Sequence, residues 1–221
     1  MEKNDRDTSH KNDTLVILIH GFCRGAKDMQ FWKKHLKKTF PHILTPDLPT
    51  RYSSFERCLQ VLTEEISAAS PEQYKELCIA GHSMGGLLAR EYLARNCPAN
   101  AGKLICVGTP HYGSRLADIA LLLPGAGRIW KPLHALKLSA RKVLTVPPVA
   151  GLETAIIVST NNGHWPGKLF LSRESDGLVE KHSALAEDAK HIAYTQASHI
   201  SMQYDLQTAD LILKFFTENK F

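Results

Sequence analysis

Short apolar runs alternate with amphipathic segments along most of this chain. Three of the runs, at residues 15–19, 77–80 and 103–108, are largely apolar, which is typical of strands buried on both faces of a sheet. Three further strands are expected at residues 42–45, 155–159 and 191–195. Because strands and helices alternate, the pattern predicts an α/β fold with a mostly parallel, twisted sheet covered by helices on both faces.

Between these strands, apolar positions recur at the spacing of a helical face. Helices are predicted at residues 29–40 and 206–218, and another follows the strand at 77–80 and continues to about residue 96. A capping box, Ser53-x-x-Glu56, predicts the start of a fourth helix that ends near Ala69. A turn-rich loop at 161–167 and a short extended piece at 169–171 are also expected.

Residues 115–150 depart from this alternation. They contain an apolar run at 116–123, a Pro-Gly-rich turn and a short helix predicted within 133–142. An insertion of this kind at the mouth of a site is a candidate cap or substrate-binding wall. The alternative is a pair of surface helices packed on the sheet.

The length of 221 residues and the ordinary apolar and charged fractions indicate one globular domain over residues 15–221. The polar residues 1–14 are expected to form a flexible tail. They do not have the pattern of a secretion signal, and the apolar run that follows is too short to span a membrane. Cytoplasmic residence without stable membrane insertion is therefore expected.

Charge and cysteine content narrow the choice of partners. The formal net charge of +5 is modest and no nucleic-acid motif accompanies it, so no nucleic-acid partner is expected. The five cysteines are odd in number and lack a C-x-x-C pair, which favours a reducing compartment over a disulfide framework or a metal site. Four lysines make a local basic face, which indicates a solvated helix surface or, alternatively, weak contact with anionic lipid or acidic substrates: Lys33, Lys34, Lys37 and Lys38.

The stretch LCIAGHSMGGLLA at residues 77–89 carries the clearest chemical signal. It places Ser83 in a G-x-S-x-G motif between an apolar strand and a helix, which is the context of a nucleophile elbow. Glycines on both sides allow the strand and the helix to pack closely, and the helix N-terminus favours a developing oxyanion. The alternative is a glycine-rich turn that contains an ordinary serine.

A serine nucleophile needs a base, and the base needs a group that orients it. Of the eleven histidines, His199 is preferred because it lies in the loop after the last predicted strand and downstream of every acid candidate. The alternative is a histidine in a surface loop.

Asp176 is preferred as the acid because its Ser-Asp-Gly turn lies between two apolar segments. The alternative is an Asx turn, in which the carboxylate caps its own backbone. Glu187 and Asp188 look solvated, and Asp205 follows the presumed base too closely. For the oxyanion hole, the backbone N–H groups of Met84 and of Phe22, after the bend at Gly21, are the expected donors.

Five motifs follow one another along the chain: HGF at 20–22, GHSMGG at 81–86, GTPHYGS at 108–114, DGLV at 176–179 and SH at 198–199. Together they resemble the α/β-hydrolase fold, and specifically its bacterial lipase and esterase-like members. The resemblance covers roughly residues 14–217. It implies Ser83 as nucleophile, Asp176 as acid and His199 as base, with backbone donors at Phe22 and Met84.

In such enzymes the segment that corresponds to 108–114 lies beside the pocket and leads into the cap region. His111 and Tyr112 of this segment are accordingly expected to bind substrate. His20 and His82, which flank the two oxyanion-hole motifs, are expected to do the same.

The function predicted from these residues is a serine hydrolase that cleaves small-molecule carboxylic esters through an acyl-enzyme, without a metal or an organic cofactor. Apolar residues 116–123 and Trp130 are expected to line a pocket for short to medium acyl chains. The same machinery would serve a thioesterase, an amidase or an acyltransferase. A hydrolase-like binding protein and a peripheral membrane protein are the non-enzymatic alternatives, and the oligomeric state is not predicted.

Overall fold

A computed structural model describes residues 13–143, 151–163 and 165–221 of the chain. Its centre is a six-stranded sheet in the order β2-β1-β3-β4-β5-β6, and every neighbouring pair of strands is parallel. The strands are β1 (Thr14–Ile19), β2 (His42–Leu44), β3 (Glu76–His82), β4 (Ala101–Val107), β5 (Glu153–Ser159) and β6 (His191–Thr195). The predicted parallel α/β fold is confirmed, and each strand lies within about two residues of its predicted start and end.

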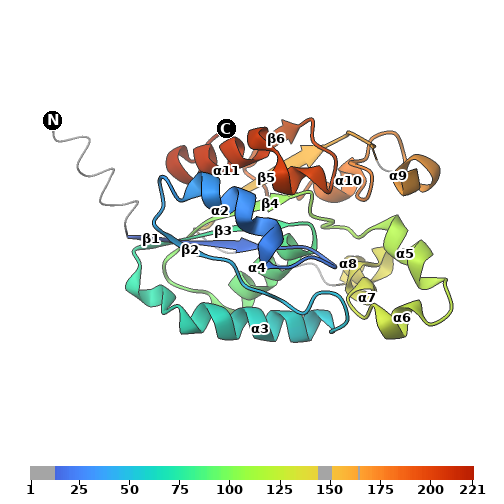
Figure 1. The fold of residues 1–221 in the computed structure, drawn as a ribbon, viewed down its shortest axis with the longest axis horizontal. Coiled ribbons are helices and arrows are strands. Elements are labelled where there is room, and N and C mark those ends of the chain that lie inside the picture. Colours follow the sequence, from blue (N-terminus) through green and yellow to red (C-terminus); the bar gives the residue numbers. More distant parts are fainter. Residues whose placement is uncertain (1–12, 144–150, 164) are drawn as a thin grey trace.

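Helices cover both faces of this sheet (Figure 1). On one face lie α2 (Gln30–Leu36) and α11 (Leu206–Glu218), and on the other lie α3 (Phe55–Ala68) and α4 (Met84–Asn96). Each face has its own hydrophobic core, because alternate side chains of the buried strands point to opposite faces. Trp32 and Phe215 are fully buried on the α2 and α11 side, and Leu62 and Leu87 on the other.

Two helix predictions need correction, the first mainly at its C-terminal end and the second at its N-terminal end. The helix predicted at 29–40 is shorter, since the 3₁₀ helix η1 (Ala26–Met29) precedes α2, which ends at Leu36. Helix α3 begins one residue later than the capping box implied, because the side chain of Ser54, and not of Ser53, accepts the N–H of Arg57. Helices α4 and α11 end where the sequence pattern predicted.

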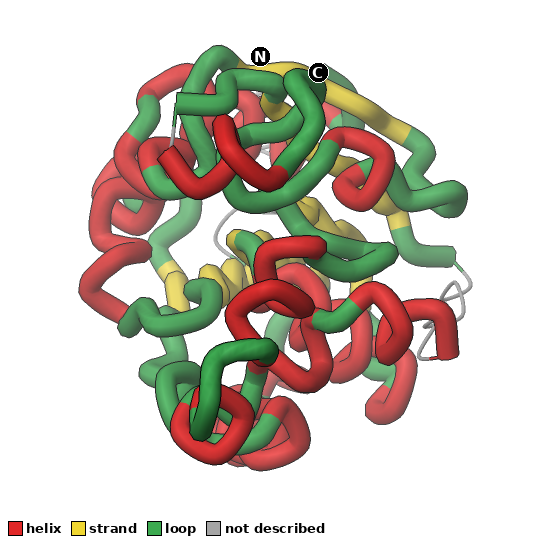
Figure 2. Tube along the Cα trace, turned by 90° about the vertical axis from the view of Figure 1, so that its right-hand side faces the viewer, coloured by secondary structure: helices red, strands yellow, loops and turns green. Residues whose placement is uncertain are grey.

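Four short helices make up what we call the cap segment, residues 115–143: α5 (Arg115–Leu121), α6 (Ala126–Ile129), α7 (Leu133–Leu136) and α8 (Leu138–Val143). The single helix predicted within 133–142 is divided at Lys137, whose ψ of 146° is extended and breaks the helical path. The cap segment lies beyond the carboxyl ends of the strands, and Figure 2 looks onto this end, where short helices and loops stand in front of the sheet. Residues 144–150 of the predicted insertion lie outside the described residues.

The remaining short elements are η2 (Pro71–Gln73), α9 (Trp165–Phe170), α10 (Lys181–Ala184) and η3 (Ser201–Tyr204). The extended piece predicted at 169–171 is wrong, because α9 includes Leu169 and Phe170. The predicted tail falls mostly outside the described residues, and Thr14, its last residue, already belongs to β1. None of the helices in the described ranges combines the length and the apolar character that a membrane span requires.

Candidate active site

Ser83 forms the whole connection between β3 and α4. Strand β3 ends at His82 and α4 begins at Met84, so the chain turns within a single residue. Ser83 has φ of 54° and ψ of −124°, a conformation that a residue with a Cβ rarely adopts. Its N–H donates to the carbonyl of Val107 on the neighbouring strand at 2.8 Å, which helps to hold the turn in place.

The two glycines of the motif are required by close packing. A Cβ on Gly81 would lie 2.5 Å from backbone atoms of Gly86, and a Cβ on Gly85 would lie 2.3 Å from the carbonyl oxygen of Ile19. Real Cβ atoms do not approach backbone at such distances. The strand–turn–helix context predicted for Ser83 is therefore present, and its glycines bring α4 directly against the ends of β1 and β3.

Asp176 and His199 form a buried pair. Asp176 Oδ2 lies 2.7 Å from His199 Nδ1, and both side chains are at most 5% exposed. The other oxygen, Oδ1, accepts the N–H groups of Leu178 and Val179 at 3.0 and 2.7 Å. The two loops are also joined through their backbones, since the N–H of His199 donates to the carbonyl of Asp176 at 2.9 Å.

This arrangement determines which nitrogen of His199 can act as a base. A carboxylate only accepts, so Nδ1 carries the proton and Nε2 keeps a free lone pair. His199 and Ser83 line the same cavity. In the described part of the chain no hydrogen bond joins their side chains, and catalytic hydrogen bonds of this type commonly tighten when a substrate binds.

Gly108 directly follows β4, and its missing side chain leaves room for the Asp176–His199 pair. Its φ of 56° is left-handed, and a Cβ at this position would lie 3.2 Å from Asp176 Oδ2 and 3.3 Å from His199 Nδ1. The sequence pattern predicts Gly108 as the last residue of a strand and the first residue of the GTPHYGS motif, with no role at the site. Its place directly after a buried strand was the available signal for a role at the site.

His82 lines the cavity, as expected, but its hydrogen bond goes to the protein. Its Nε2–H donates to the backbone carbonyl of His199 at 2.9 Å, and the two rings are 4.9 Å apart. Burial, together with the electrostatic effect of the neighbouring His199, lowers the pKa of His82 well below its ordinary value, so the ring is neutral. His82 therefore supports the loop that carries the candidate base, a role that sequence spacing did not reveal.

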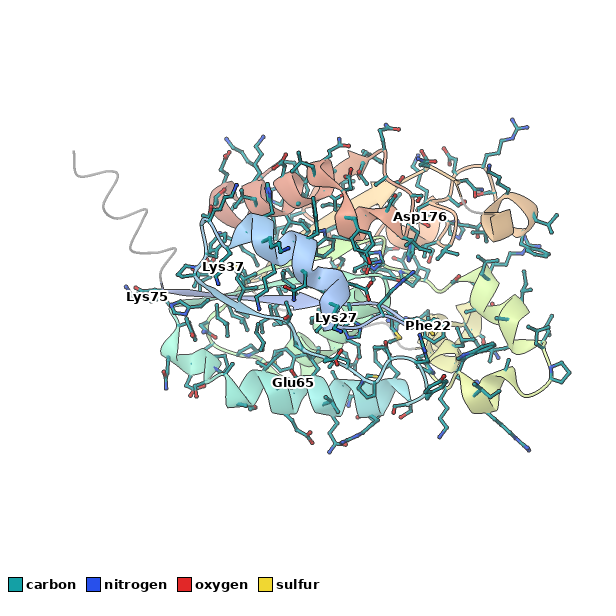
Figure 3. The ribbon with its side chains drawn as sticks, viewed as in Figure 1. Phe22, Lys27, Lys37, Glu65, Lys75 and Asp176 are labelled. Atoms are coloured by element: carbon teal, nitrogen blue, oxygen red, sulfur yellow. The ribbon has the colours of Figure 1, made fainter. Side chains whose placement is uncertain are left out.

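The candidate oxyanion donors belong to the helix that follows Ser83 and to the loop that follows β1. Met84 is the first residue of α4, so its N–H is one of the helix donors that have no partner within the helix. Phe22 lines the cavity and follows Gly21, where a Cβ would lie only 3.0 Å from the Cβ of Ser83. Figure 3 shows Phe22 and Asp176 at the same end of the sheet, where the strands finish.

Three of the four residues expected to bind substrate do not line the cavity: His20, His111 and Tyr112. The ring of His20 is fully buried and accepts the N–H of Leu48 at 3.0 Å, so it holds the loop after β2. Burial lowers its pKa, against the opposing effect of its hydrogen bond to the Gly21 carbonyl. The side chain of His111 is buried away from the cavity lining, and burial and then the charges of two arginines lower its pKa to about 3.

The cavity has a volume of about 390 Å³. One side is apolar and is formed by the cap segment; we call it the apolar wall, and it consists of Leu116, Ala117, Ala120, Trp130, Leu133 and Leu136. The remaining lining comes from residues 21–24 after β1, the elbow at 82–83, Pro110, Ser114 and the loops that carry the candidate acid and base, at 178–179 and 199–200. Of the run 116–123 expected to line an acyl pocket, Leu116, Ala117 and Ala120 line the cavity, as does Trp130.

The described residues contain no group of three or more His, Cys, Asp or Glu side chains that could hold a metal ion. All five cysteines are free thiols, and three of them are buried: Cys58, Cys78 and Cys106. Burial raises the pKa of Cys106 to about 11, so this thiol is protonated and packs as a small apolar group.

Comparison with protein-family models finds one that covers most of the chain. The model of the alpha/beta hydrolase family matches residues 16–211. A comparison with curated proteins found no match.

Solved structures with the same fold include bacterial lipases and esterases. The propeptide form of Bacillus licheniformis lipase BlEst2 has a TM-score of 0.79 and 18% sequence identity, and the match covers 92% of this chain and 50% of that one. The mature form of the same lipase has a TM-score of 0.70 and 17% identity, with 90% of each chain covered. The metagenomic carboxyl esterase MGS0156 has a TM-score of 0.70 and 16% identity, covering 90% of this chain and 69% of that one.

Proposed function

This chain belongs to the alpha/beta hydrolase family, and we propose that it is a serine hydrolase that cleaves carboxylic esters through an acyl-enzyme intermediate. The observation that carries the proposal is the buried pair of His199 and Asp176, 2.7 Å apart, which faces the same cavity as a strained Ser83. A binding protein has no need for an oriented imidazole beside a strained serine. The fold of the lipase and esterase neighbours is consistent with this activity.

The first step is the activation of Ser83. Asp176 holds the proton on Nδ1 of His199, so Nε2 accepts the Ser83 hydroxyl proton as the oxygen attacks the ester carbonyl. The two oxygens of Asp176 accept three N–H groups, and the carboxylate stabilises the imidazolium that forms. His199 then gives the same proton to the oxygen of the leaving alcohol.

The tetrahedral intermediate carries a negative charge on the former carbonyl oxygen. The proposed donors that stabilise it are the backbone N–H groups of Met84, which directly follows Ser83, and of Phe22, which lines the cavity. Loss of one such donor typically costs about 3 kcal/mol. The N-terminus of α4, 13 residues long, adds its positive dipole end. Water activated by His199 then releases the acid and restores Ser83.

The apolar wall determines which part of the substrate lies where. It has no charged side chain among its six residues, so it suits an acyl chain better than a polar alcohol. A cavity of about 390 Å³ accommodates short to medium acyl chains together with a small leaving group. We therefore place the acyl chain against α5 and α7.

A fluorophosphonate probe tests the proposal directly. The wild-type protein should be labelled covalently, and Ser83→Ala should not. Ser114→Ala is a matched control, because Ser114 lines the same cavity and donates its hydroxyl to the Leu178 carbonyl. Equal labelling of wild type and Ser83→Ala, or no labelling of a correctly folded wild type, would contradict the proposed nucleophile.

The class of leaving group needs a second measurement. A series of p-nitrophenyl esters of increasing acyl length should give the highest kcat/KM at short to medium chains. A parallel panel of thioesters and anilides with the same acyl groups should be cleaved more slowly. A thioester turned over faster than its matched ester would replace esterase by thioesterase and leave the rest of the mechanism in place.

A further inference from the structure

One permanent charge faces an otherwise largely apolar cavity. Among the described residues that line it, Arg24 alone is an Asp, Glu, Lys or Arg. Arg24 follows two residues after the candidate oxyanion donor Phe22, in the loop between β1 and η1. Its side chain is 32% exposed, and Arg24 belongs to the lining of the cavity.

The nearest carboxylate only partly neutralises this charge. Asp28 lies 4.0 Å from the Arg24 guanidinium, at the outer limit of an ion pair. Both of its oxygens already have other donors, the N–H of Gly25 at 2.9 Å and the hydroxyl of Tyr204 at 2.5 Å. Burial by itself raises the pKa of Asp28, but the two hydrogen bonds and the Arg24 charge together lower it by more, so the net shift is downward. The carboxylate is therefore ionised and held in place. The five N–H donors of the guanidinium are thus mostly free for a ligand.

The position of this arginine relative to the base indicates which part of a substrate it would meet. Tyr204, which holds Asp28, ends the 3₁₀ helix η3 that directly follows His199. Arg24 is therefore linked, through Asp28 and Tyr204, to the segment that carries the candidate base. Because the base hands its proton to the leaving group, the leaving group must lie near His199.

The apolar wall cannot take a charged group. The apolar wall comes from the cap segment, and it would bury an anion without a partner at a high cost. The lining of the cavity thus combines the apolar wall with a single cation, Arg24, and with the candidate nucleophile Ser83.

We propose that Arg24 binds an anionic group on the leaving alcohol, so that the preferred substrates are esters of short to medium acyl chains with a phosphate- or carboxylate-bearing alcohol. This inference rests on the proposed serine hydrolase function and names its substrate class. A planar guanidinium binds either anion through two parallel hydrogen bonds, so Arg24 can bind both phosphate and carboxylate.

Two matched pairs of esters test the inference with the full-length protein. Glycerol monobutanoate and its 3-phosphate differ only in a phosphate, and 2-nitrophenyl butanoate and 3-butanoyloxy-4-nitrobenzoate differ only in a carboxylate. In the wild type, the anionic member of at least one pair should have the higher kcat/KM. The pair that shows the preference identifies the anion as phosphate or carboxylate.

Arg24→Gln should lower kcat/KM for the preferred anionic ester by about 10- to 100-fold, mainly through KM, and leave its neutral partner within about twofold. Arg24→Lys should recover part of the loss, because it keeps the charge but loses the bidentate geometry. Arg51→Gln is the matched control: Arg51 lies beside the Cys23 side chain and is exposed, but it does not line the cavity. It should have little effect.

Each of three results would overturn the inference and leave the esterase proposal intact: no preference for either anion in the wild type, an equal loss on charged and neutral esters in Arg24→Gln, or an equal loss in Arg51→Gln. If the wild type hydrolyses no ester, the proposed function fails instead. Calorimetric binding of glycerol monobutanoate 3-phosphate to Ser83→Ala then decides the subsite alone. Binding that weakens about tenfold or more on adding Arg24→Gln supports it, and unchanged or undetectable binding overturns it.

Discussion

The nucleophile elbow and the cap segment meet at one cavity, but they are built in opposite ways. In the elbow, residues 81–86, added carbon atoms would meet backbone at distances down to 2.3 Å. In the cap segment, four helices of 4–7 residues leave large apolar side chains in solvent, such as Leu122 at 81% and Ile129 at 53% exposure. A Cβ at Gly125 of the cap segment would meet no atom within 4 Å.

This difference separates two tasks. The chemistry depends on atoms held within a few tenths of an ångström, which a crowded backbone supplies. The choice of acyl chain depends on the size of an apolar space, which side chains on short helices can change without disturbing the sheet. Changes at the elbow and its partners should therefore abolish activity or stability, whereas changes in the cap segment should redirect specificity.

The largest effect is expected for Asp176→Asn. The amide would favour the wrong tautomer of His199, and kcat should fall by about 10⁴-fold, which is about 5.5 kcal/mol of transition-state stabilisation. Steady-state hydrolysis of a p-nitrophenyl ester measures this. Glu174→Gln, an exposed carboxylate of the same loop that pairs with Lys181, should change kcat less than twofold. Similar losses in the two variants would contradict the catalytic role of Asp176.

Gly85→Ala tests the close packing of the elbow through the free energy of unfolding. Its Cβ would displace α4 from the Ile19 and His20 carbonyls, and we expect about 3 kcal/mol of lost unfolding free energy together with lost activity. Gly125→Ala is the paired variant from the cap segment. Its φ of 80° is strained for alanine, so it should cost about 1 kcal/mol and leave activity unchanged. Equal losses in urea unfolding would remove the distinction between the two regions.

His111 lies where the sheet passes into the cap segment, and it makes stability depend on pH. Its pKa is about 3 in the folded protein and about 6.5 when unfolded, so between these values only the unfolded chain binds the proton. Stability therefore falls as the pH falls below 6.5, by about 2 kcal/mol at pH 5 from this group alone. Burial lowers the pKa of His20 and His82 in the same direction.

His111→Asn should therefore lose about 2 kcal/mol less unfolding free energy than the wild type between pH 7 and pH 5. Urea unfolding at the two pH values measures the difference. His182→Asn, at an exposed position, should leave the difference unchanged. An identical pH dependence for His111→Asn and wild type would show that His111 is not a source of the acid sensitivity.

Features that depend on local sequence rules could be predicted from the sequence, and features that depend on tertiary packing could not. The elbow and the strands depend on local rules, a glycine motif and apolar runs, and the strands and α4 lie within two residues of where these rules place them. The carboxyl ends of parallel strands meet at one edge, so strand-end residues Ser83 and His199 could be expected in one place. The structure places both at the same cavity, although their catalytic roles stay predictions.

Side-chain direction could not be predicted, because it depends on partners from distant segments. His20 follows a strand as expected, but its ring turns toward the Leu48 N–H of another loop. Asp188 looked solvated among polar residues, yet it is half-buried and pairs with Arg90 of α4 at 2.6 Å. Arg24 gave no signal at all, because a single arginine in a loop has neither period nor motif. These three positions are decided by tertiary packing.

The smallest effect is expected for a substitution that adds carbon atoms to the cap segment, as Gly85→Ala does to the elbow. Ala120 lines the cavity from α5 and is half-buried, so Ala120→Phe should fill part of the acyl space. Since about one methylene of lost room is worth 1–3 kcal/mol, kcat/KM for octanoyl esters should fall about tenfold while acetyl esters are unaffected. Leu122→Phe, next to the same helix but outside the cavity lining, should leave the acyl-length profile unchanged. Uniform loss across all acyl lengths in Ala120→Phe, with reduced stability, would mean that the cap segment is as rigid as the elbow and that the acyl chain does not lie against it.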